Sequence, residues 1–282
     1  MKEIGESMLT ILLITMSIVL SGLSIYLFDY RVDGIINNVF IIIPSLLVGA
    51  LITALLLGLF LELYYTYLPK NKLQKSMFAH KIVKQVASVP LHFSRMKIKV
   101  VGKEHLPKDP GFTIYTNHST WIDPTIIMNG LYNYPVAALG KEWAFKIFVI
   151  GKFAPLFGFV MIKRSDPRQS AQAIKQVVSN VKDGFSMVIF PEGTRSPNVD
   201  SLLDFKDGAF KVALRSERPI VPITIVKPTN YKSIKWPFKK RVTLVIHKPL
   251  LFEDFKDLKT FELSKIVKEI IEELRKPESD AK

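Results

Sequence analysis

The chain has 282 residues, of which 48% are hydrophobic, and its 39 basic and 25 acidic residues give a formal net charge of +14. This composition is too apolar for an intrinsically disordered protein, and without cysteine the chain can form neither disulfides nor a cysteine nucleophile. No two of its five histidines stand at metal-ligand spacing, so we expect no metal site.

Two uncharged segments lie near the start of the chain. Residues 7–28 and 35–61 contain no charged residue, and either segment, as a helix rising about 1.5 Å per residue, could cross the roughly 30 Å hydrocarbon core of a bilayer. The first segment lacks the basic leader and the small-residue cleavage site of a signal peptide. We therefore expect a two-helix membrane hairpin over residues 1–68 and a cytoplasmic domain over residues 69–282. Two buried core helices are the alternative.

The distribution of charge predicts the orientation and the partners. Basic residues gather just after the second segment, so the positive-inside rule places the domain over residues 69–282 on the cytoplasmic face of the cell membrane. Residues 1–61 carry a net charge of −2 and residues 62–282 carry +16. Such a domain attracts acidic partners, and next to a bilayer we expect an anionic membrane surface. Nucleic acid is disfavoured because no nucleic-acid-binding motif is present.

Two segments of this domain could face a membrane. Residues 71–89 have the spacing of an interfacial helix or of an ordinary packed helix. Residues 232–241 mix basic and aromatic residues as a membrane-binding segment does.

The rest of the chain alternates predicted strands and helices. Strands are expected at residues 112–118, 136–140, 159–164, 186–190, 220–226 and 242–250, and helices at residues 124–133, 142–158, 167–183, 207–216 and 258–275. This alternation predicts an α/β fold with a largely parallel sheet flanked by helices. Ligands of such sheets bind outside the carboxyl ends of the strands.

Three motifs follow predicted strands and could carry chemistry. In N-H-S-T-W-I-D (residues 117–123), Asp123 can fold back onto His118 and leave one ring nitrogen free as a base. In F-P-E-G-T-R-S (residues 190–196), Arg195 could grip a phosphate. In G-F-V-M-I-K-R (residues 158–164), the terminal cations could add a second phosphate contact. A structural histidine, a surface ion pair and a solvated strand end are the respective alternatives.

Taken in order with V-P-I (residues 221–223), these motifs resemble the four blocks of the glycerolipid acyltransferase family, which includes the 1-acylglycerol-3-phosphate acyltransferases. The similarity covers roughly residues 98–250. It implies an O-acyltransferase of phospholipid biosynthesis that moves a fatty acyl group from a thioester to lysophosphatidic acid, giving phosphatidic acid. The donor would be acyl carrier protein or coenzyme A, a co-substrate, so that no cofactor is needed.

The resemblance also implies roles for individual residues. His118 would be the general base and Asp123 would orient it. Glu192, Gly193, Thr194 and Arg195 would hold the glycerol phosphate, with Arg195 on the phosphate. Arg164 and, less strongly, Lys141 would add phosphate contacts, and Pro222 would lie near the acyl path. Thr120 stands where the family usually has serine, and Met161 where it usually has an aromatic residue. Another acceptor (glycerol 3-phosphate or a lysophospholipid) and a non-catalytic lipid-binding protein are the alternatives.

Overall fold

The computed structural model describes residues 15–23, 26, 35–67, 77–142, 154–163, 165–235 and 237–273. The chain divides into two compact units, Met1–Lys72 and Leu73–Lys282.

The first unit contains a helix over residues 15–23 and the helix α2 (Ile35–Tyr67), which are joined by small polar side chains. Ser21 Oγ donates a hydrogen bond to the carbonyl of Ser45 at 2.8 Å, and Ser17 Oγ donates one to Thr53 Oγ1 at 3.2 Å. A Cβ at Gly49 would overlap Ser21, so the absence of a side chain allows the helices to approach closely here.

The predicted membrane-spanning hairpin is not supported. Within the described parts of the chain, no helix combines the length and the apolarity that crossing a membrane requires. Of the first predicted span, residues 15–23 form a described helix, which is about 14 Å long at 1.5 Å per residue. Most of the remainder lies outside the described residues.

The second unit is built on a seven-stranded sheet with the order β1-β7-β6-β2-β5-β3-β4. The strands are β1 (Met96–Val101), β2 (Thr113–Thr116), β3 (Val136–Lys141), β4 (Val160–Ile162), β5 (Ser186–Ile189), β6 (Ile220–Val226) and β7 (Lys240–Ile246). All neighbouring pairs are parallel except β6 and β7. The predicted α/β fold with a largely parallel sheet is therefore confirmed.

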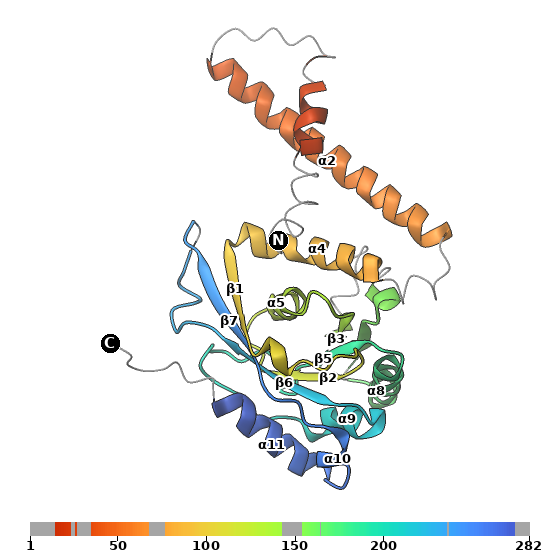
Figure 1. Ribbon diagram of the computed structural model, residues 1–282. Helices are drawn as coiled ribbons and strands as arrows, with labels where there is room; N and C mark the ends of the chain where they lie inside the picture. The colour runs from red at the N-terminus through yellow and green to blue at the C-terminus, as the bar shows by residue number, and fades with distance from the viewer. Residues whose placement is uncertain are drawn as a thin grey trace. The chain divides into compact units, whose positions relative to one another are not determined.

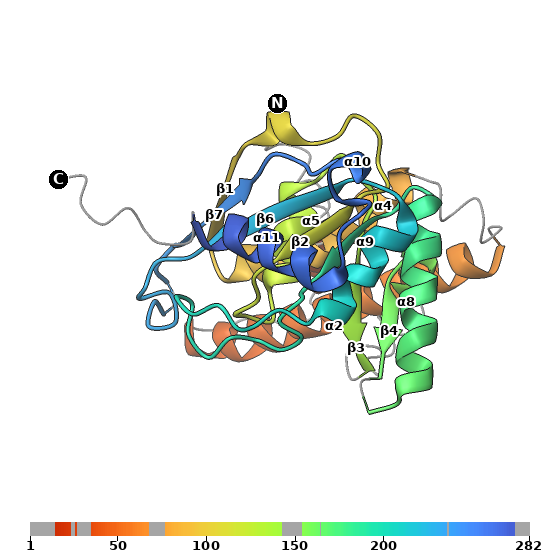
Figure 2. The ribbon, with the colours of Figure 1, turned by 90° about the horizontal axis from the view of Figure 1, so that it is seen from below.

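Helices cover both faces of the sheet, as Figures 1 and 2 show. One face carries α4 (Met77–Phe93) and α5 (Asp123–Gly130), and the other carries α8 (Pro167–Lys182), α9 (Lys211–Ser216), α10 (Phe252–Phe255) and α11 (Thr260–Glu273). Short 3-10 helices span Lys103–His105, Ala154–Phe157 and Asp207–Phe210. Because successive strand residues point to opposite faces, Ile114 packs in the core beneath α4 and α5 whereas Tyr115 packs beneath α8, α9 and α11.

The predicted helix over residues 167–183 has the expected ends. Asp166 accepts a hydrogen bond from the backbone N–H of Gln169 at 3.0 Å, as an N-cap does. Gly184, just past the end, has a φ of 96°, which favours glycine. Of the helix predicted over residues 142–158, residues 143–153 lie outside the described residues, and Ala154–Phe157 form a 3-10 helix.

The helix α4 packs on the domain along one side. His80, Lys84, Ser88 and Leu91 are buried at helical spacing, which supports an ordinary packed helix over an interfacial one. The amino group of Lys84 donates to the carbonyls of Leu131 and Tyr132, both at 2.8 Å, and to that of Tyr134. These carbonyls follow α5, so Lys84 fixes α4 to the carboxyl end of α5.

Candidate active site

The two strongest motifs meet at the edge where β2, β3, β5 and β6 have their carboxyl ends. Asn117 fixes the turn that leaves β2, because its side chain accepts from the backbone N–H of Ile225 at 2.8 Å and donates to the carbonyl of the same residue at 3.0 Å. His118 follows directly, and its Nδ1 lies 3.0 Å from Asp123 Oδ2. The His118–Asp123 pair expected from the sequence is therefore present.

The Asp123 carboxylate is held by several donors. Asp123 is fully buried at the start of α5, with Pro124 next to it in the first turn. Its Oδ2 accepts hydrogen bonds from the backbone N–H groups of Ser119 at 2.8 Å and Thr120 at 2.9 Å, and its Oδ1 accepts from the Thr120 hydroxyl. A carboxylate with so many donors has a single orientation.

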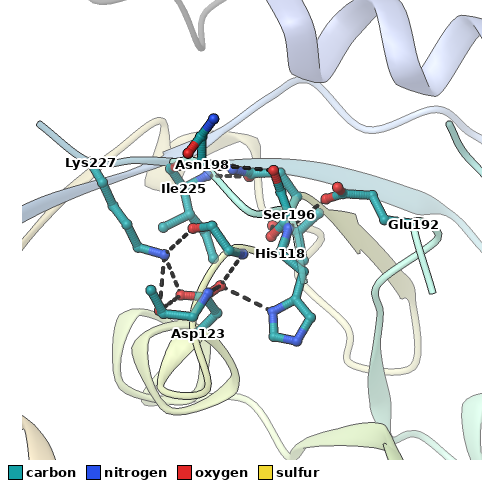
Figure 3. Close-up of polar contacts among 11 residues, drawn as sticks. His118, Asp123, Glu192, Ser196, Asn198, Ile225 and Lys227 are labelled. Atoms are coloured by element: carbon teal, nitrogen blue, oxygen red, sulfur yellow. Dashed lines mark hydrogen bonds and ion pairs between the residues drawn. The ribbon is translucent and has the colours of Figure 1, made fainter. Parts of the chain in front are cut away.

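A buried lysine completes this cluster and was not foreseen from the sequence. Lys227 follows β6, is 5% exposed and forms an ion pair with Asp123 Oδ1. Its amino group also donates to Ser119 Oγ at 2.7 Å and lies 3.1 Å from Thr120 Oγ1. Figure 3 shows the Asp123 carboxylate between the Lys227 amino group and the His118 ring. A charged residue directly after an apolar strand at this edge was the signal available in the sequence.

The charge state of the cluster follows from these contacts. Burial alone would raise the pKa of Asp123, but the His118 hydrogen bond and the Lys227 charge outweigh it and hold that pKa at about 2. Burial lowers the pKa of Lys227 in spite of its ion pair with Asp123. At neutral pH Asp123 is ionised and accepts a hydrogen bond from Nδ1–H of His118. In the neutral imidazole the other ring nitrogen, Nε2, is then the one that can accept a proton.

The His118 ring can be reached from solvent. Its side chain is 17% exposed, and the ring stacks on Phe190 with 4.1 Å between the ring centroids. A half-buried imidazole with a free Nε2 and a fixed, ionised partner can accept a proton from a hydroxyl group placed beside it.

The loop over residues 190–196 is tied to the histidine loop through Glu192. This side chain is 2% exposed. Its Oε1 accepts from the backbone N–H of His118 at 2.6 Å and its Oε2 accepts from that of Leu203 at 3.0 Å. The Ser196 N–H in turn donates to the carbonyl of His118 at 2.7 Å. Glu192 thus supports the position of the His118 backbone.

The other residues of this loop are arranged differently. Gly193 is buried in a turn with a φ of 75°, and its N–H donates to the carbonyl of Phe190 at 3.0 Å. Thr194 and Arg195 are exposed, and Arg195 forms no ion pair with any residue that the structure describes. Its guanidinium is available to an anionic ligand.

Of the remaining predicted cations, Lys141 is described by the structure and Arg164 is not. Lys141 is exposed at the end of β3, which pairs with β5, the strand before the Arg195 loop. Arg164 lies outside the described residues. Among the described residues, no group of three or more acidic or histidine side chains could hold a metal ion.

Comparisons with known proteins point to a family of acyltransferases. The acyltransferase family model matches residues 97–226. A 1-acyl-sn-glycerol-3-phosphate acyltransferase of Bacillus subtilis is 33% identical over 162 residues, which cover 57% of this chain and 77% of the relative. A chloroplastic 1-acyl-sn-glycerol-3-phosphate acyltransferase of Brassica napus is 35% identical over 179 residues, covering 61% of this chain and 50% of the relative. The chain thus spans about half the length of the plant relatives that it matches.

A solved structure shares the fold. The crystal structure of the 1-acyl-sn-glycerophosphate acyltransferase of Thermotoga maritima superposes with a TM-score of 0.63 over 80% of this chain and 91% of that one, at 24% sequence identity.

Proposed function

The chain belongs to the family of 1-acyl-sn-glycerol-3-phosphate acyltransferases, and on that premise we propose that it transfers a fatty acyl group from a thioester to the free hydroxyl of lysophosphatidic acid, giving phosphatidic acid. The observation that carries the proposal is the buried, ionised Asp123 held against Nδ1 of His118. A protein that only bound lipid would need cations but not this pair.

The proposed reaction proceeds by direct attack. His118 Nε2 accepts the proton of the acceptor hydroxyl while the hydroxyl oxygen forms a bond to the thioester carbonyl carbon. The carbon–sulfur bond then breaks, and the protonated ring returns the proton to the departing thiolate. Proton transfer of this kind contributes typically 10²–10⁴-fold to a rate, as an order of magnitude. Asp123 orients the ring and stabilises its charged form, and Lys227 and Thr120 keep the carboxylate in place.

The acceptor phosphate is assigned to the exposed cations on the β5–β3 side of the histidine. Arg195 can form a bidentate pair with a phosphate. Lys141 ends β3, and Arg164 comes two residues after β4 in the sequence; we assign both to the same phosphate. Gly193 and Thr194 lie in the same loop and would contact the glycerol. Holding the phosphate fixes the distance from the hydroxyl to His118, which is the positioning part of catalysis. We assign Glu192 to support of the two loops, because its carboxylate accepts from two backbone N–H groups.

The donor is acyl carrier protein or coenzyme A, and both carry acidic groups that the basic domain attracts. We place the enzyme at the cytoplasmic face of the cell membrane, where the lipid acceptor is found.

An acceptor panel tests this proposal. The purified full chain is given lysophosphatidic acid, glycerol 3-phosphate and a lysophospholipid with a larger head group, each with acyl carrier protein and coenzyme A thioesters in separate reactions. We expect phosphatidic acid to be the main product. Arg195→Gln should raise the KM for lysophosphatidic acid, whereas Arg218→Gln, an exposed arginine at the opposite edge of the sheet just before β6, should not. Failure of every acceptor would favour a lipid-binding protein.

A further inference from the structure

A hollow of about 250 Å³ adjoins the catalytic cluster on the β1 side of β2. Three stretches of chain surround it: the residues between α4 and β1, the loop after β2, and the connection from β6 to β7. The lining residues are Ser94, Met96, Thr120, Trp121, Ile122, Tyr231, Lys232 and Lys240. Since the Thr120 hydroxyl also donates to Asp123, the hollow begins one side chain away from the catalytic pair. It lies on the opposite side of β2 from the proposed phosphate cations.

Large aromatic side chains are exposed around this hollow. Trp121 is 61% exposed within the histidine motif itself. Phe93, which directly precedes Ser94, is 77% exposed, and Phe238, two residues before Lys240, is 71% exposed. Exposed aromatic groups gathered at one place mark a surface that binds another molecule.

The chain segments that carry Phe93 and Phe238 contain basic residues and no acidic ones. Residues 92–103 and 227–241 contain lysine and arginine but no aspartate or glutamate. Lys235 and Lys239 are exposed beside Phe238. The Lys240 amino group lies over the Tyr231 ring at 4.7 Å from its centroid. The occupant of this surface therefore has to be both anionic and able to accept aromatic rings.

We propose that Phe93, Trp121, Phe238, Lys235 and Lys239 form a lipid-facing surface that docks the catalytic edge onto an anionic bilayer. Tryptophan and phenylalanine side chains partition into the interfacial region of a membrane, and each lysine near an anionic leaflet adds about 1 kcal/mol of attraction, or about a fivefold factor in binding. A soluble acidic protein would satisfy the lysines but not the exposed rings. The inference rests on the proposed function, because a lipid acceptor could then pass from the bilayer to His118 without crossing water.

A site-specific label tests the position of this surface. The chain has no cysteine, so Phe238→Cys in the full chain offers one attachment point for an environment-sensitive fluorophore. Phe261→Cys, 55% exposed on α11, is the matched control. With vesicles that contain phosphatidylglycerol, we expect a blue shift at position 238 and quenching by lipids spin-labelled near the head group, but neither at position 261. Equal, water-like spectra at both positions would overturn the proposal, as would a response at position 238 to acidic carrier protein and not to vesicles.

A second pair of variants links the surface to catalysis. One double variant carries Lys235→Glu and Lys239→Glu. The control double variant carries Lys259→Glu and Lys265→Glu, which change the net charge by the same amount at exposed positions at the other end of the domain. On anionic vesicles we expect the first pair to lose about twentyfold or more in activity, from a fivefold factor for each lysine, and the second pair to stay near wild type. With a short-chain lysophosphatidic acid in neutral detergent micelles, all variants should match wild type. Equal loss in vesicles and micelles would contradict the docking role. If the wild-type protein were inactive in both vesicles and micelles, the proposed function would be refuted. The fluorophore at position 238 would still show whether the surface docks on the bilayer.

Discussion

Replacing Lys227 with methionine removes the cation that faces Asp123 and keeps a side chain of similar length. Both partners are buried, with Lys227 5% and Asp123 0% exposed. The variant therefore leaves a carboxylate without its counter-ion in a site that water does not reach. The hydrogen bonds from His118, Ser119 and Thr120 remain.

Breaking a buried ion pair by removing one partner costs about 3–5 kcal/mol. Because several donors still hold the Asp123 carboxylate, we expect Lys227→Met to lower the free energy of unfolding by about 3 kcal/mol, at the lower end of that range. Lys235→Met is the control, since it makes the same chemical change at an exposed position and should alter stability by less than about 0.5 kcal/mol.

The effect has a defined pH dependence. In the folded protein the pKa of Asp123 is about 2, against 3.8 for an ordinary aspartate. A lowered pKa contributes stability that is present above pH 3.8 and is lost as the pH falls toward 2; for Asp123 this amounts to about 2 kcal/mol. Without Lys227 the burial of Asp123 raises its pKa, so this contribution shrinks. The stability difference between wild type and Lys227→Met should therefore narrow as the pH falls from about 5 toward 2.

Urea unfolding in detergent micelles, repeated across that pH range, measures the difference. Activity at neutral pH should show a lower kcat in Lys227→Met with little change in KM, because the variant disturbs the orientation of His118 and not the phosphate contacts. If Lys227→Met and Lys235→Met were equally stable at neutral pH, or if their difference did not depend on pH, the assigned ion pair would be refuted.

Three further substitutions probe contacts that hold the loops and helices of the domain together. Glu192→Gln should lower the free energy of unfolding by about 1–3 kcal/mol, since a backbone N–H loses its charged acceptor. Thermal unfolding measures the change, and Arg195→Gln, at an exposed position of the same loop, should alter stability little. Lys84→Met should destabilise by a similar amount, because buried backbone carbonyls after α5 lose their donor, and hydrogen exchange should rise in α5 first. Gly102→Ala should destabilise by about 1–3 kcal/mol, and by more than Gly184→Ala in urea unfolding. Both glycines have positive φ, but only at Gly102 would a Cβ also overlap a backbone carbonyl.

The contacts that could be predicted from the sequence are local ones. His118 and Asp123 are five residues apart at the turn from β2 into α5, so their spacing was sufficient to propose the pair. The alternation of apolar strands and amphipathic helices likewise predicted the parallel sheet. The strand β1 was missed in the sequence. It lies at the edge of the sheet, where Lys97 and Lys99 face solvent between half-buried residues. A segment of six residues with two lysines does not show the continuous apolar pattern by which the other strands were predicted.

The contacts that could not be predicted depend on strand order. Lys227 and Asp123 are separated by 104 residues and meet because β6 lies beside β2 in the sheet. Nothing local in the sequence fixes that order. The resemblance implied that Glu192 holds the glycerol phosphate, whereas its buried carboxylate accepts from the backbone N–H of His118.

The initial rate of phosphatidic acid formation by wild type and His118→Ala, measured with saturating thioester and lysophosphatidic acid in the same micelles, tests the central claim most directly. Loss of the general base should lower kcat by about 10²–10⁴-fold, while the KM for lysophosphatidic acid, which depends on the Arg195 side of the site, stays within a few fold. Equal values of kcat for the two proteins would contradict the assignment of His118 as the base.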